Sequence, residues 1–147
     1  MAAGNSVSAP ERTLVTTRIY DAPREAVYKA WVDPKQLARW FPPEGFTSPR
    51  CEIDARPGGS FSIGLRPADR SQEGFELGGT YREVKRPERL VQVIGDGRVM
   101  TTTLDEVLGG TKLTLSLEMA AGMTEAQERG GWTQILDHLA THVATLS

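Results

Sequence analysis

The sequence has few of the residues that build disulfides, metal centres or reactive thiols. It contains a single cysteine, Cys51, and two histidines, His138 and His142, in 147 residues. One cysteine excludes an internal disulfide and any cysteine-rich metal site, and it fits a reducing compartment. Cys51 shares strand parity with Ile53, so a small buried side chain is a simpler interpretation than a nucleophile.

Long apolar runs and an excess of positive charge are also missing. No stretch of about 18 apolar residues occurs, and the N-terminus lacks the basic start and apolar segment of a signal peptide. The 17 Lys and Arg residues stand against 19 Asp and Glu, a formal net charge of -2, which offers no basic surface to a polyanion. We therefore expect a cytoplasmic protein that binds neither nucleic acid nor a membrane.

Motifs of the common catalytic and cofactor sites are absent as well: the sequence has no GxSxG, HExxH, CxxC, GxGxxG or P-loop pattern. His138 and His142 stand four residues apart, a spacing that can place two metal ligands on one helix face, but a zinc site needs a third ligand. A solvated helix flank is the simpler interpretation of this pair. We predict no metal, no cofactor and no catalytic residue, so a binding protein is expected before an enzyme.

The N-terminal part of the chain predicts a tail and a strand. Residues 1–11 are small and polar and indicate a flexible tail ahead of a single domain over residues 12–147. The first alternating segment puts Val15 and Ile19 on one parity and Arg18 on the other. We therefore expect a strand that buries the face carrying Val15.

Two short helices and a run of strands follow. Pro23 falls in the first turn of one predicted helix, and Asp33 with Gln36 forms a capping box that begins the second, which ends at Pro42-Pro43. From Thr47 to about Met119 every clear segment alternates with a period of two between turn residues. This pattern indicates six antiparallel strands with short connections, about seven strands in all.

The C-terminal segment predicts one long amphipathic helix. Thr124 and Gln127 form a second capping box, and apolar residues recur at helical intervals from Trp132 to Leu146. Such a helix would be roughly 33 Å long at 1.5 Å per residue and would span the domain. Gly130-Gly131 weakens its interior, and we expect close packing against the sheet to be the reason, with a bend that admits a ligand as the alternative.

These elements in this order predict an α+β domain whose curved antiparallel sheet wraps around the C-terminal helix. The segments TRIYDAPREAVYKAWVDPKQLARWFPPEGF, RPGGSF, GGTYREV before PERLV, and GGWTQILDHL resemble the family of homologues of the activator of the heat-shock protein 90 ATPase. That family belongs to the SRPBCC superfamily, which includes START domains and birch-pollen allergens. The resemblance covers about residues 13–146 and implies the helix-grip fold, with a cavity between the sheet and the long helix.

The resemblance implies less about chemistry, because superfamily members range from carriers of lipids, hormones and polyketides to cyclases. We predict that a small apolar or aromatic molecule binds in a cavity of at least about 300 Å³. Core packing is the simpler interpretation of the aromatic residues among its predicted walls. The residues expected to line the cavity are Trp40, Phe41, Phe61, Ile63, Tyr81, Thr102, Leu115, Leu117, Trp132, Leu136 and Leu139.

Two other functions stay open at this point. The family name suggests a cochaperone or another protein-binding module, and a homodimer is a further possible partner. A cyclase-like enzyme would need an ionisable residue that faces the cavity, for which Asp105, Glu106 and His142 are candidates. An interior without ionisable groups would argue against the enzyme.

Overall fold

The computed structural model describes residues 13–69, 73–119, 122 and 124–145, so the predicted tail over 1–11 and the last stripe residue, Leu146, lie outside the described part. The elements follow the predicted order. They are β1 (Thr13–Tyr20), α1 (Arg24–Val32), α2 (Pro34–Trp40), β2 (Phe46–Thr47), β3 (Cys51–Ile53), β4 (Ser60–Pro67), β5 (Phe75–Lys85), β6 (Arg89–Ile94), β7 (Val99–Val107), β8 (Gly110–Glu118) and α3 (Glu125–Ala144).

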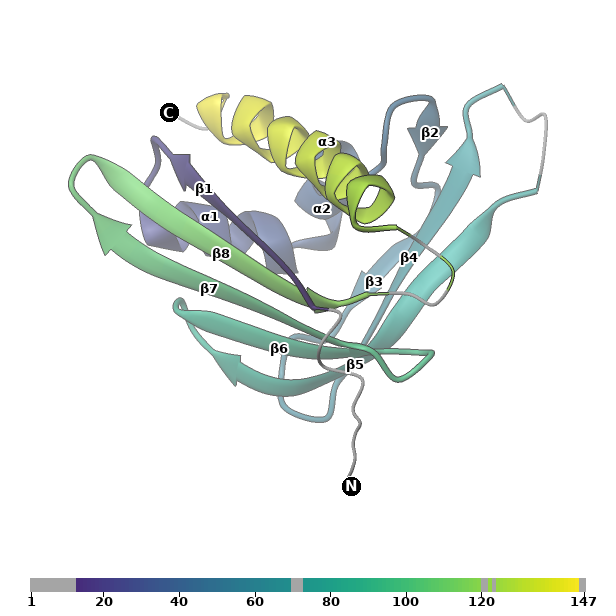
Figure 1. The fold of residues 1–147 in the computed structure, drawn as a ribbon, viewed down its shortest axis with the longest axis horizontal. Coiled ribbons are helices and arrows are strands. Elements are labelled where there is room, and N and C mark those ends of the chain that lie inside the picture. The colour runs from purple at the N-terminus through teal and green to yellow at the C-terminus, as the bar shows by residue number, and fades with distance from the viewer. Residues whose placement is uncertain (1–12, 70–72, 120–121, 123, 146–147) are drawn as a thin grey trace.

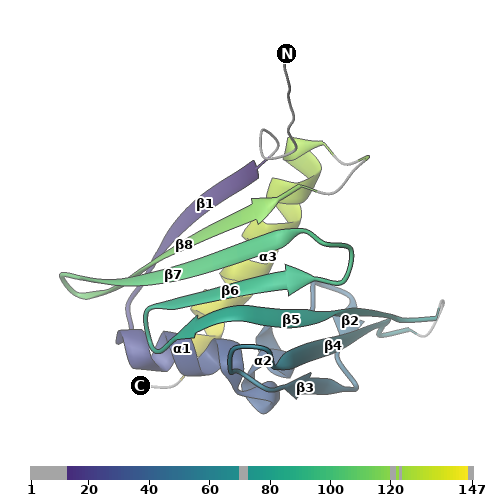
Figure 2. The same cartoon turned by 90° about the horizontal axis from the view of Figure 1, so that it is seen from below.

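The strands form one antiparallel sheet in the order β1-β8-β7-β6-β5-β4-β2, with β3 also paired to β4 (Figure 2). The sheet curves, and α3 lies across its concave face with α1 and α2 beside it (Figure 1). The predicted α+β helix-grip architecture is therefore confirmed. The two-residue strand β2 is the one strand that the sequence pattern did not predict, because two residues are too few for an alternation.

Strand β1 buries the face opposite to the one predicted. Leu14 and Tyr20 are buried, whereas Val15 and Ile19 are 50% and 60% exposed. Arg18, which shares the buried parity, is half-buried rather than solvent-facing. The alternation predicted the strand correctly. It predicted the wrong buried face because Arg18, a charged residue, lies on the inner face.

The reason for this inversion is the helix that crosses β1. Arg18 forms an ion pair with Asp137 of α3, and the hydroxyl of Tyr20 donates a buried hydrogen bond of 3.0 Å to the carbonyl of Leu136. Arg18 can face inward because Asp137 neutralises its charge and its aliphatic stem can pack against apolar neighbours. Polar residues on the inner face of β1 thus fasten the sheet edge to α3.

The central strands carry the predicted inward parity. Alternate residues of β8 pair directly with alternate residues of β7, and all six are buried. These cross-strand pairs are Leu113 with Leu104, Leu115 with Thr102, and Leu117 with Met100. The prediction that Thr102 faces inward is confirmed by its exposure of 1%.

Helix α3 begins at the predicted capping box. The hydroxyl of Thr124 accepts from the backbone N–H of Gln127 at 3.1 Å, and the side chain of Gln127 accepts from the N–H of Thr124 at 2.9 Å. The expected close packing at Gly130-Gly131 is wrong: a Cβ atom on either residue would meet no atom within 4 Å. Both glycines lie on the exposed face of a continuous α-helix.

No helix in the described ranges is both long enough and apolar enough to cross a membrane.

Candidate ligand-binding site

Four aromatic side chains join the three helices above the sheet. The ring centroids of Trp31 and Trp40 are 4.9 Å apart, those of Trp40 and Phe41 5.8 Å, and those of Phe41 and Trp132 5.9 Å. Each pair meets edge to face, an arrangement that aromatic quadrupoles favour. The chain of rings runs from α1 through the end of α2 to α3 and forms an aromatic wall over the sheet.

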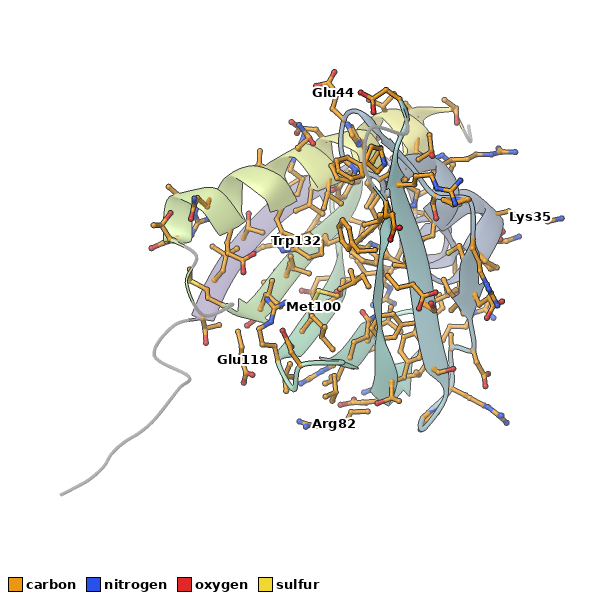
Figure 3. The ribbon with its side chains drawn as sticks, turned by 90° about the vertical axis from the view of Figure 1, so that its right-hand side faces the viewer. Lys35, Glu44, Arg82, Met100, Glu118 and Trp132 are labelled. Carbon is orange, nitrogen blue, oxygen red and sulfur yellow. The ribbon has the colours of Figure 1, made fainter. Side chains whose placement is uncertain are left out.

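Side chains fill most of the space between this wall and the strands. In Figure 3 Trp132 of α3 and Met100 of β7 lie within that space, whereas Arg82 points away from it. A small void of about 10 Å³ remains. Its lining consists of Trp31, Leu37, Phe41, Ile53, Phe61, Ile63, Leu77, Tyr81, Gln92 and Met100.

The void is far smaller than the cavity of about 300 Å³ that the sequence analysis predicted. A volume of this size holds about one water molecule. The physical reason is that aromatic and aliphatic side chains from both layers interdigitate at the density of a protein core. The void also lies under α1 and α2, and no residue of α3 is part of its lining.

Four of the eleven residues predicted to line a cavity meet around this void: Phe41, Phe61, Ile63 and Tyr81. The remaining seven are buried in the surrounding core. They are Trp40, Thr102, Leu115, Leu117, Trp132, Leu136 and Leu139. Whether any of the eleven contacts a ligand stays a prediction.

Sequence reasoning missed Gln92 as a site residue. It is the one polar residue within the apolar stretch of β6, and it shares the parity of Leu90 and Ile94, both buried. Its cross-strand partners are Tyr81 on β5 and Met100 on β7. A polar side chain on an inward parity was the signal that could have found it.

Two polar atoms of the void-lining residues are buried without a protein partner. Among the described residues, neither Nε1 of Trp31 nor Oε1 of Gln92 has a hydrogen bond, and the two residues are 4% and 5% exposed. The neighbouring Trp40 differs, because its Nε1 donates to the carbonyl of Ala30 at 2.9 Å. A buried polar group left unpaired costs about 1–3 kcal/mol, so each of these two atoms would gain from a hydrogen-bond partner.

Among the described residues that line the void none is acidic or basic, and Tyr81 is the one ionisable residue of this set. Burial raises the pKa of Tyr81, which keeps the phenol neutral. The acidic residues named for a cyclase do not face the void, because Asp105 and Glu106 are exposed at the end of β7. Cys51 is half-buried, and burial raises the pKa of its thiol to about 11, so the thiolate is not formed near neutral pH.

The two histidines fasten α3 to α2 and the turn after it. The Nδ1 of His138 donates to the carbonyl of Pro42 at 3.0 Å, and the Nε2 of His142 donates to Oε1 of Gln36 at 2.9 Å. Both are half-buried, so the expected solvated flank is wrong. Within the described part of the chain no cluster of three potential metal ligands occurs.

Solved structures of other proteins share this fold. An AHSA1-like protein from Aeromonas hydrophila shares 30% identity, with 91% of this chain and 93% of that chain aligned and a TM-score of 0.85. A protein from Chromobacterium violaceum shares 32% identity over 88% of this chain and 95% of that chain, with a TM-score of 0.81. No curated protein matches the sequence.

The sequence profile of one family matches most of the chain. The match extends over residues 21–144, from the end of β1 to the end of α3. It therefore includes every element that contributes to the aromatic wall and to the void. The chain belongs to the family of activator of Hsp90 ATPase homolog 1-like proteins, within the SRPBCC superfamily.

Proposed function

We propose that this protein binds a small apolar molecule in its interior, at the void between α1, α2 and strands β3 to β7. The observation that carries the proposal is the void itself, which combines apolar walls from both layers with lining residues whose buried polar atoms have no partner in the described part of the chain. Ligand pockets in proteins have this composition, since apolar walls supply affinity and a few polar groups fix orientation.

A ligand larger than water needs the void to enlarge. Met100 forms part of its floor, and methionine changes rotamer easily because its side chain is unbranched. Phe41 forms part of its roof and contacts Trp132 of α3 with a centroid separation of 5.9 Å. Rearrangement of Met100 and Phe41 would join the void to the space beneath α3, where the predicted residues Trp132, Leu115 and Leu117 lie.

Titration with N-phenyl-1-naphthylamine, an uncharged fluorophore that brightens in apolar sites, tests the proposal. We expect saturable enhancement with the wild-type protein and a large loss of affinity in Ile53→Phe, which adds bulk to the lining of the void. Leu108→Phe adds the same ring at a fully exposed turn position and should bind the fluorophore as the wild type does. Equal binding by all three proteins would overturn the assignment of the site to this void.

A second candidate function, recognition of a chaperone or another protein, is supported by the family name and by one surface feature. Val15 and Ile19 are exposed on β1, which is an edge strand of the sheet. Exposed apolar residues on an edge strand are typical of a surface that pairs with another chain. Stimulation of a heat-shock protein 90 ATPase by the wild type but not by Val15→Lys would support this function, and no stimulation would exclude a role as an activator of that ATPase.

A further inference from the structure

We propose that Trp31 and Gln92 select an uncharged ligand that carries a hydrogen-bond acceptor and a hydrogen-bond donor on an apolar ring system, as a lactam or a phenol does. This inference rests on the proposed function, because it names the ligand class of the same site. It follows from three properties of the residues that line the void: the chemistry of the unpaired atoms of Trp31 and Gln92, the burial of these atoms, and the lack of charged side chains in the lining.

The unpaired atoms define the complementary ligand groups. An indole N–H can donate only, and an amide oxygen can accept only. A ligand that satisfies both must therefore accept from Trp31 and donate to Gln92. A pure hydrocarbon makes the same apolar contacts but leaves both atoms unpaired. Its binding free energy is therefore less favourable than that of a ligand that forms both hydrogen bonds.

The two residues approach the void from opposite layers. Trp31 lies on α1 in the aromatic wall, whereas Gln92 lies on β6 in the floor of the void, between Tyr81 and Met100 of the adjacent strands. A ring system held between wall and floor would present its edge groups to both residues. Recognition from two sides fixes the orientation of a planar molecule, which one hydrogen bond does not.

The absence of charge along the lining excludes an ionised ligand from the selected class. Among the described residues that line the void, none is acidic or basic, so a carboxylate or an ammonium would be buried without a counter-charge. The desolvation free energy of such a buried ion exceeds the stabilisation that the apolar contacts supply. Neutral heterocycles and phenols escape this penalty.

Core packing alone does not account for these residues. Leucine at position 92 would conserve the side-chain volume and remove an unpaired polar atom, and would thus favour folding. Trp40 shows that the fold can satisfy an indole in this wall, since its N–H reaches the carbonyl of Ala30. Polar groups kept in a core at a cost in stability are typical of functional sites.

Isothermal titration with three bicyclic probes of similar size tests the inference: 2-quinolone, which carries the adjacent acceptor and donor, naphthalene, which carries neither, and 2-naphthoate, which is charged. The wild type should bind 2-quinolone about tenfold more tightly than naphthalene. Gln92→Leu and Trp31→Phe should each reduce or abolish that preference while still binding naphthalene. Val93→Thr, on the opposite face of β6, is the matched control and should keep the preference.

The outcomes separate this inference from the function on which it rests. If none of the probes and no N-phenyl-1-naphthylamine binds, the proposed function fails and the inference falls with it. If naphthalene and 2-quinolone bind equally, or if Gln92→Leu and Trp31→Phe both keep the preference, the ligand site stands and the inference is wrong. Tight binding of 2-naphthoate would also contradict it. Circular dichroism of each variant establishes that a lost preference does not reflect a lost fold.

Discussion

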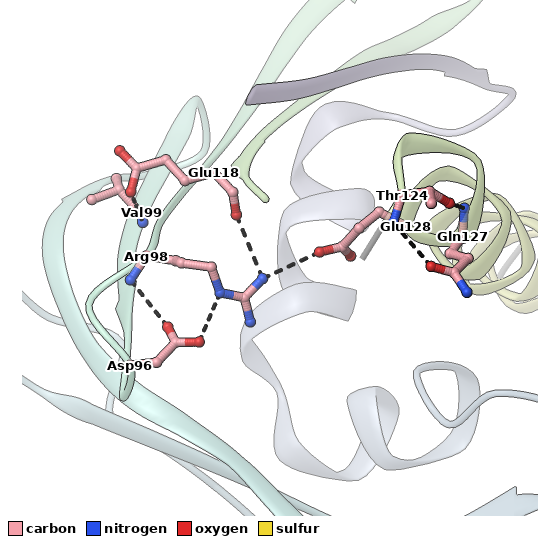
Figure 4. A network of polar contacts seen from close by, with 7 residues as sticks. All are labelled: Asp96, Arg98, Val99, Glu118, Thr124, Gln127 and Glu128. Carbon is pink, nitrogen blue, oxygen red and sulfur yellow. Dashed lines mark hydrogen bonds and ion pairs between the residues drawn. The ribbon is translucent and has the colours of Figure 1, made fainter. Parts of the chain in front are cut away.

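Arg98 and Glu128 connect the turn between β6 and β7 to the first turns of α3, with 3.4 Å between Nη1 of Arg98 and Oε1 of Glu128 (Figure 4). Arg98 also contacts Asp96 at 2.8 Å, and the Glu118 carboxylate accepts from the N–H of Val99 at 2.9 Å. The carboxylate side chain of Glu128 is only 9% exposed. The pair thus lies where the sheet and the N-terminal part of α3 come together.

Replacement of Arg98 by methionine should lower the free energy of unfolding by about 1–3 kcal/mol, because it removes a cation from a nearly buried carboxylate. Urea denaturation measures the change. The double variant Arg98→Met/Glu128→Leu should recover part of the loss, since the nearly buried carboxylate of Glu128 is then removed together with its cationic partner. The exposed pair Arg50–Glu52 is the control, and Arg50→Met should change stability by less than about 1 kcal/mol.

Thr102 and Thr111 form a matched pair of buried threonines, at 1% and 0% exposure. The hydroxyl of Thr111 donates to the carbonyl of Ala22 at 2.7 Å, whereas that of Thr102 has no partner among the described residues. Thr111→Val should therefore cost about 1–2 kcal/mol, and Thr102→Val should be neutral or stabilising by up to about 1 kcal/mol. Thermal unfolding of both variants checks this, and equal destabilisation would contradict the assignment of Thr102 as unpaired.

Alanine at Gly130 or Gly131 should stabilise the protein by up to about 1 kcal/mol each, because helix propensity improves and the added methyl group meets no neighbour. Gly58 provides the contrast. Its surroundings are equally open, but its φ of +84° is unfavourable for any residue with a Cβ atom. Gly58→Ala should therefore destabilise, and a melting temperature that rises in all three variants would contradict this reasoning.

His142 should make stability depend on pH below neutrality. Burial is the main cause that lowers the pKa of His142 below its usual value near 6.5, and the charge of the nearby Arg39 lowers it further. The charge of Asp33 acts in the opposite direction. Near pH 6 the unfolded chain therefore binds more protons than the folded protein. The free energy of unfolding falls as pH drops through 6.5, and this loss ends once the pH is below the pKa of His142 in the folded state. Melting temperatures between pH 7.5 and 5 should fall less in His142→Gln than in the wild type, and an unchanged slope would exclude His142 as the cause.

The order of elements was determined by the sequence, because each signal depends on neighbours along the chain. The capping box at Thr124 and Gln127 begins α3, and the alternation from Leu113 to Leu117 marks the inner face of β8. Periodicity and capping act within a few residues, so they are visible without tertiary contacts. The family resemblance supplied the helix-grip arrangement, and the comparisons confirmed it.

Tertiary structure alone decided which face of β1 is buried and how large the interior space is. Arg18 faces inward because Asp137, more than a hundred residues away in the sequence, lies over it. The void measures about 10 Å³ because side chains from α1, α2 and the strands interdigitate there. Gln92 and Trp31 become a candidate site only because, within the ranges that the structure describes, their buried Oε1 and Nε1 atoms have no hydrogen-bond partner. Hydrogen bonding and packing across distant segments depend on side-chain volumes and positions, which a linear pattern does not contain.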